Sequence, residues 1–103
     1  MSRTKLTTIF LVIFLYTGIL YADKYQFKLK SGNNTYKAKY STVQVLDARG
    51  NTIHCGSTDR YGRITIRNIS NGTYKCKVFY NKIWRKAELT FDGSSNLKVV
   101  YVR

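Results

Sequence analysis

The segment that most constrains the fold of this 103-residue chain runs from Val45 to Tyr80, where short apolar stretches alternate with turns that contain glycine or asparagine. The turns fall at residues 49–51, 59–62 and 70–72, at nearly even spacing. The stretches between them are rich in β-branched and aromatic residues, which favour strands. This pattern predicts an all-β sandwich or barrel.

Seven strands are expected in one antiparallel β-sandwich. In the first of them Tyr25, Phe27 and Leu29 point to one side, which is typical of a half-buried strand. The alternating residues that point to the other side are Lys24, Gln26, Lys28 and Lys30. The second strand is long enough to contain a bulge or a break near residues 39–41. No apolar run after residue 22 keeps a 3.6-residue period, so no helix is expected there. The expected strands are residues 24–30, 35–47, 52–56, 63–68, 73–80, 83–91 and 97–102.

Residues 1–22 have the three parts of a secretory signal peptide: a basic start with Arg3 and Lys5, an uncharged apolar stretch, and the small residue Ala22 where cleavage can occur. A retained membrane anchor is the alternative, since the uncharged stretch is close to the shortest that spans a bilayer. Cleavage predicts a secreted or periplasmic protein with no stable membrane span. Residues 23–103 then form one small domain.

The mature chain is strongly basic. It keeps 16 lysines and arginines against five acidic residues, a formal charge of +11. Such a charge attracts anionic polymers, lipid headgroups or acidic proteins. Several basic residues stand at alternating, outward positions of different strands, where they discourage edge-to-edge association and are expected to be dispersed rather than clustered. These are Lys28, Lys30, Lys37, Lys39, Arg63 and Arg67.

Cys55 and Cys76 both lie after the signal peptide, where an oxidising compartment favours a disulfide. Cys55 alternates with Ile53, and Cys76 with Tyr74 and Val78, so both thiols are expected on inward faces. A single disulfide between them is one reading of this arrangement, and two buried thiols are the other.

Several motifs resemble those of the carboxypeptidase regulatory-like domains, which are related to the transthyretin-like and Cna-B-type sandwiches. They are residues 43–47, Gly50-Asn51, the segment 58–66 with its D-x-x-G turn, and the N-G-x-Y strand start at residues 71–74. The resemblance covers roughly residues 27–102 and implies a prealbumin-like sandwich. It also implies a mostly non-catalytic module, in which Thr58, Asp59 and Gly62 serve a tight turn.

The sequence offers no catalytic constellation, so no enzyme is expected. His54 is the only histidine, and hydroxyisourate hydrolases of the same wider group need several. The only glutamate, Glu88, falls on a polar strand face, where it lacks the desolvated environment that an internal isopeptide bond requires. No cluster of cysteines or histidines suggests a metal site, and no cofactor is expected.

One candidate ligand-binding surface follows from a two-residue hairpin loop at Asn81-Lys82. Such a loop places Phe79 opposite Trp84 and Lys77 opposite Lys86, with Lys75 on the same face. Aromatic rings beside ammonium groups can stack on sugars or bases while they neutralise anionic groups. Alternatively, the rings are covered and serve only packing.

The function expected from these features is that of an exported, non-catalytic module that binds, or has a structural role on, a protein or cell-envelope component. The alternative is an electrostatic binder of an anionic polymer such as acidic polysaccharide, lipopolysaccharide or nucleic acid. Salt separates the two, because charge-driven complexes weaken steeply as salt rises.

Overall fold

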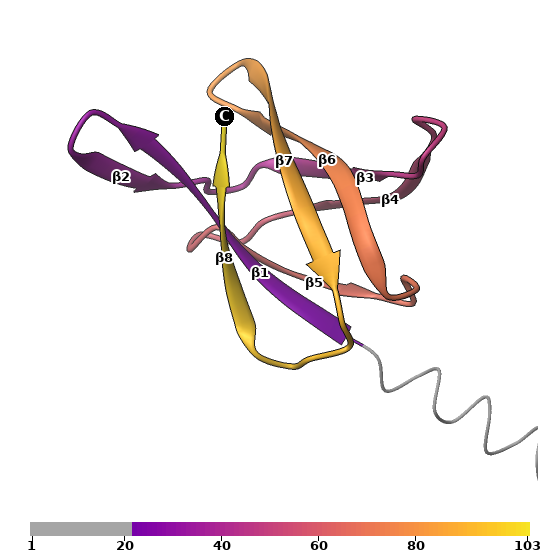
Figure 1. Cartoon of the computed structure of the whole chain (residues 1–103). Coiled ribbons are helices and arrows are strands. Elements are labelled where there is room, and N and C mark those ends of the chain that lie inside the picture. Colours follow the sequence, from indigo (N-terminus) through magenta and orange to yellow (C-terminus); the bar gives the residue numbers. More distant parts are fainter. Residues whose placement is uncertain (1–21) are drawn as a thin grey trace, which may run out of the picture.

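A computed structural model describes residues 22–103 of the chain, and the predicted signal peptide lies almost wholly outside them. Two four-stranded sheets pack as a sandwich (Figure 1). Every regular element among the described residues is a strand, which confirms the all-β prediction. The strands are β1 (Ala22–Ser31), β2 (Asn34–Lys37), β3 (Thr42–Leu46), β4 (Thr52–Ser57), β5 (Arg63–Arg67), β6 (Gly72–Tyr80), β7 (Ile83–Phe91) and β8 (Leu97–Val102).

In sheet A, strand β1 pairs with β8 along one side and with β5 and β2 along the other. Sheet B has the order β4-β3-β6-β7. The sandwich has eight strands rather than about seven, and β1 pairs with β8 in parallel, whereas every other pairing is antiparallel. The parallel pair arises because β8 returns along β1 after the chain has completed sheet B.

The extra strand comes from the expected break near residues 39–41, where the chain leaves β2 in sheet A and enters β3 in sheet B. Tyr40 has a positive φ of 49° there. The buried hydroxyl of Thr58 holds the crossing by donating to the carbonyl of Ala38 at 2.6 Å and accepting the N–H of Ser41 at 2.8 Å. Thr58 therefore anchors the crossover between the sheets, in addition to preceding the tight turn.

The hydrophobic core of the described residues lies between the two sheets. Its largest members are three aromatic rings, of which Tyr25 and Phe91 meet edge to face with centroids 5.3 Å apart. Burial of such rings dominates the stability of a small sandwich. The core residues are Tyr25, Phe27, Ala38, Val43, Val45, Ile64, Ile66, Cys76, Val78, Leu89, Phe91 and Val102.

The prediction that both cysteines point inward is wrong, and no disulfide joins them. Cys55 pairs with Gln44 of β3, and Cys76 pairs with the next residue, Val45. Adjacent residues of a strand point to opposite faces, so the two thiols lie on opposite sides of sheet B. Cys55 is exposed, Cys76 is buried, and both are free.

We expect a native-state thiol titration to modify Cys55 and to spare Cys76 until the protein unfolds. Burial raises the pKa of the Cys76 thiol to about 12, so little of the reactive thiolate forms at neutral pH. The measurement is the number of thiols that react with a maleimide, counted by intact mass with and without denaturant. A Cys55–Cys76 crosslink in a non-reducing peptide map would contradict the structure.

Candidate functional site

The candidate surface is centred on the hairpin of β6 and β7, whose register is the one expected from the sequence. Asn81 and Lys82 have φ values of 53° and 64°. Positive φ at both central residues makes a type I′ turn, the form whose twist suits a two-residue hairpin. Phe79 therefore pairs with Trp84, and Lys77 with Lys86.

Phe79 and Trp84 form an aromatic pair on the outer face of sheet B. Their ring centroids are 4.9 Å apart, with an interplanar angle of 54°. Trp84 remains 48% exposed and Phe79 38% exposed. No other strand among the described residues covers the pair, so half of a large apolar surface stays available for contact with a ligand.

Three lysines continue this surface along the strands. Lys77 and Lys86 are directly paired, and Lys75 pairs with Glu88 one row further on. The backbone of Lys86 bonds to Arg103 rather than to β6, so Lys77 and Lys86 occupy a non-hydrogen-bonded pair, where side chains are closest. None of the three lysines belongs to an ion pair within residues 22–103. An anionic group of a ligand placed between these lysines would reduce their mutual repulsion.

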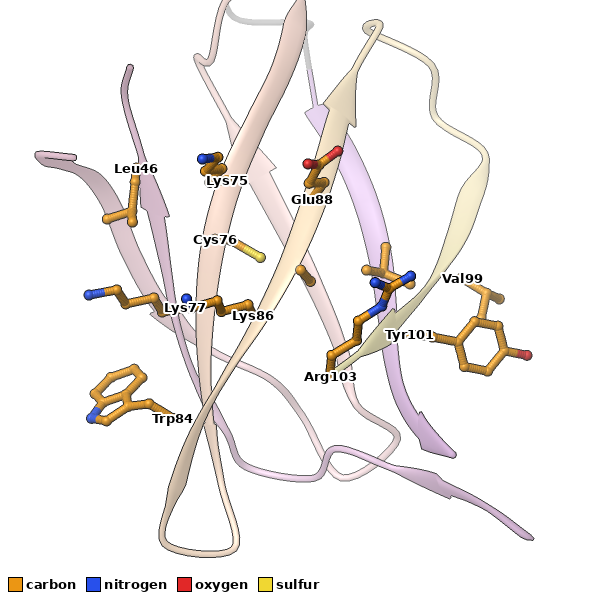
Figure 2. Close-up of a pocket in the computed structure, with 12 residues that line it drawn as sticks. Leu46, Lys75, Cys76, Lys77, Trp84, Lys86, Glu88, Val99, Tyr101 and Arg103 are labelled. Carbon is orange, nitrogen blue, oxygen red and sulfur yellow. The ribbon is translucent and has the colours of Figure 1, made fainter. Parts of the chain in front are cut away.

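An open groove of about 940 Å³ begins on this face and passes around the edge of β7 to β8 (Figure 2). Figure 2 shows Lys75 and Glu88 toward one end, Trp84 toward the other, and Val99 and Tyr101 across from them on β8. Four of the five predicted site residues line the groove, and Phe79 contacts it through Trp84. The lining residues are Leu46, Lys75, Cys76, Lys77, Trp84, Lys86, Ala87, Glu88, Val99, Val100, Tyr101 and Arg103.

The groove exists because β7 and β8 are joined only at their ends. At one end the backbones of Lys86 and Arg103 exchange hydrogen bonds of 3.1 and 3.0 Å. At the other end the ammonium group of Lys98 donates to the carbonyl of Thr90 at 3.3 Å. No ladder joins the two strands between these points in the described part of the chain. The edge of β7 between these two points therefore has no paired strand beside it among residues 22–103.

A partly buried ion cluster lies near the Thr90 end of β7. The ammonium of Lys98 lies 2.8 Å from Asp23, which is 3% exposed, and 2.7 Å from the exposed Asp92. Backbone N–H groups of Asp92 and Gly93 also donate to Asp23 at 3.2 Å. Hydrogen bonding to Lys98 lowers the pKa of Asp92. Burial, followed by the charge of Asp23, raises the pKa of Tyr25. The cluster is structural, because its groups satisfy one another.

The residues that sequence reasoning missed include the whole β8 side of the groove, notably Val99, Tyr101 and Arg103, the last of which directly follows the strand. Alternation in residues 97–102 shows that Val99 and Tyr101 share a face. It does not show that β8 returns beside β7, because that neighbourhood depends on the parallel pairing with β1.

The groove can hold an extended or ring-shaped ligand with anionic groups. Its charged side chains are cationic except for Glu88, and the aromatic pair gives a stacking surface at one end. Residues 22–103 contain no group of three or more histidine, cysteine or acidic side chains placed to hold a metal ion. No helix in that range is long and apolar enough to cross a membrane. Comparison with models of known protein families and with curated proteins finds no match to this chain.

Proposed function

We propose that the chain is an exported, non-catalytic β-sandwich module that binds a protein or cell-envelope partner through the outer face of sheet B. The observation that carries the proposal is the half-exposed Phe79–Trp84 pair beside lysines that have no counter-ion. Exposed aromatic residues surrounded by polar groups are typical of binding hot spots. The motifs shared with carboxypeptidase regulatory-like domains, which are mostly binding or structural modules, support the same reading.

The anionic-polymer alternative is supported by the same uncompensated lysines. It differs from the first proposal in what supplies the affinity. A polymer held by charge alone loses affinity steeply as salt rises, in proportion to the number of phosphate-like contacts it makes. A partner centred on the aromatic pair should retain most of its affinity in salt.

We expect replacement of Trp84 by alanine to weaken binding by about tenfold to a hundredfold, which is the effect of removing an interface hot spot of roughly 1.4–2.8 kcal/mol. Residues 22–103 are tested against solubilised cell-envelope extract, heparin and dextran, from about 50 to 200 mM salt. Trp84→Phe is the matched control, because it keeps an aromatic ring opposite Phe79.

Binding to the extract that survives the higher salt, is lost in Trp84→Ala and is kept in Trp84→Phe supports the first proposal. The polymer alternative is supported if the protein binds only heparin, if this binding disappears as salt rises, and if neither substitution changes it. The same result contradicts the aromatic site. The alanine variant should lose only about 1 kcal/mol of stability, because the ring is half exposed. Thermal melts therefore distinguish lost binding from lost folding.

A further inference from the structure

The outer face of sheet A, on the opposite side of the sandwich, gathers basic residues that the sequence suggested were dispersed. Lys28 of β1 pairs with Lys37 of β2, and Gln26 of β1 pairs with Arg63 of β5. Paired residues share a face, and residues two apart along a strand share it too. The six strand cations on this face are Lys24, Lys28, Lys30, Lys37, Arg63 and Arg67.

Two tyrosines, Tyr61 and Tyr101, lie among these cations, and Lys30 is positioned over the ring of Tyr101. The ring of Tyr61 is contacted by Arg63, Arg60 and Lys37, at 4.5, 4.9 and 5.5 Å from its centroid. The only acidic side chain in an ion pair here is Asp59, 3.6 Å from Arg63. One carboxylate against this many cations leaves the face strongly positive.

An apolar row runs alongside the cations. Leu97, Val99 and Tyr101 of β8 pair in parallel with Lys24, Gln26 and Lys28 of β1, so they point to the same side. Leu97 is 45% exposed and Val99 47% exposed. The register between β1 and β8 is continuous from Lys24↔Leu97 to Leu29↔Val102. The outer face of sheet A is therefore amphipathic, with an apolar strand next to a cationic one.

We propose that the outer face of sheet A docks onto an anionic phospholipid surface. Lysines and arginines bind acidic headgroups, while tyrosines and aliphatic side chains enter the boundary between headgroups and acyl chains. The apolar row favours lipid over a soluble polyanion, because a sugar or phosphate polymer gains nothing from Leu97 and Val99. The inference does not rest on the partner of the β6–β7 face, although Val99 and Tyr101 also line the far wall of the groove that begins there.

The test is co-sedimentation of residues 22–103 with vesicles of phosphatidylcholine, with or without phosphatidylglycerol. We expect Lys28→Glu to weaken binding to the anionic vesicles by about 25-fold, at about fivefold per charge removed. The matched control is Lys77→Glu on the outer face of sheet B. Each substitution places a glutamate opposite a lysine, Lys37 or Lys86, so both change the net charge equally and both should fold.

The apolar row is tested separately with the double substitution Leu97→Thr and Val99→Thr. It should weaken vesicle binding by about tenfold and leave heparin binding unchanged. Ile53→Thr on β4 is its control, since Ile53 is similarly exposed at 42%. Two results would overturn the proposal. Equal losses of vesicle binding in Lys28→Glu and Lys77→Glu would indicate unspecific electrostatic attraction. Vesicle binding that is unchanged by the double substitution would indicate a surface for soluble polyanions.

Discussion

Replacement of Gly62 by alanine is expected to lower the free energy of unfolding by about 4 kcal/mol, from left-handed backbone strain and a lost buried hydrogen bond. Gly62 has a φ of +76°, and a Cβ there would lie 2.8 Å from the Phe27 carbonyl and 3.1 Å from the Ala38 nitrogen. Those two groups are hydrogen-bonded to each other, at 2.9 Å. The total free energy of unfolding of a domain of this size is roughly 4–12 kcal/mol.

The chain contains its own control for this prediction, because the turn that begins at Asp47 repeats the one that begins at Asp59. In each, the aspartate Oδ1 accepts two backbone N–H groups, and a glycine with positive φ donates to the aspartate carbonyl. Gly50 has a φ of +85°, yet nothing lies within 4 Å of its added Cβ. Gly50→Ala should therefore cost only the strain, about 1–2 kcal/mol.

Urea unfolding of both variants gives the comparison directly. A large loss in Gly62→Ala and a small one in Gly50→Ala would show that the close approach of Phe27 and Ala38 controls the effect. Equal losses would mean that the positive φ alone determines the cost. That result would contradict the close approach of Gly62 to the Phe27 carbonyl.

Replacement of Lys98 by methionine is expected to cost about 3 kcal/mol, because it leaves the nearly buried carboxylate of Asp23 without its cation. The estimate is at the low end for a buried pair, since Asp23 keeps two backbone N–H donors and the Lys98 side chain is 24% exposed. Asp92→Asn, which removes the exposed partner, should cost much less than Lys98→Met, because solvent screens the Asp92 carboxylate. The double variant Asp23→Asn with Lys98→Met should recover much of the loss, because no unpaired charge remains buried.

The same cluster gives the stability of the domain a defined pH dependence. The pKa of Asp92 is lowered from 3.8, first by the hydrogen bond from Lys98, and that of Asp59 is lowered, first by the N–H of Arg63. A lowered folded-state pKa stabilises the fold above 3.8 and loses that contribution as pH falls through the folded value. Thermal melts should therefore show a fall in stability below about pH 4. The fall should be shallower in Lys98→Met, which removes the Asp92 contribution, whereas an identical acid profile would contradict the Lys98–Asp92 contact.

Local rules predicted the parts of this molecule that depend on neighbours in sequence. The hairpin register followed from Asn81-Lys82, because a two-residue loop fixes which residues face each other. The break near residues 39–41 followed from the excessive length of the second expected strand. The bounds of β7 and β8 also agree with the expected ranges.

Alternation failed at β4, because it shows which residues share a face but not which face is inward. His54 and Gly56 pair with the buried Val45 and Val43, so Ile53 and Cys55 are turned outward. The inner side has little room, since a Cβ on Gly56 would lie 3.2 Å from the Cδ1 of Ile64. The space on the inner side of β4 is occupied by Ile64 of the other sheet. A local sequence pattern does not show this contact.

The cationic face of sheet A was missed for a related reason. Its residues come from strands that are far apart in the chain, and they meet only because β1 pairs with β8, β5 and β2 together. The groove likewise depends on the return of β8 beside β7. Local pattern predicted which residues meet on the β6–β7 face, but it predicted neither the opposite wall of the groove nor the second charged surface.

The most direct test of the proposed binding face uses Trp84, the only tryptophan in the chain, as a reporter on that face. Residues 22–103 are titrated with the component of the envelope extract that they retain at physiological salt, while tryptophan emission and its quenching by acrylamide are recorded. The account predicts a blue shift and protection from acrylamide that saturate together with binding, since the ligand covers a ring that is 48% exposed in the free protein. Saturable binding with unchanged emission and unchanged quenching would contradict the account, because it would place the partner elsewhere on the sandwich.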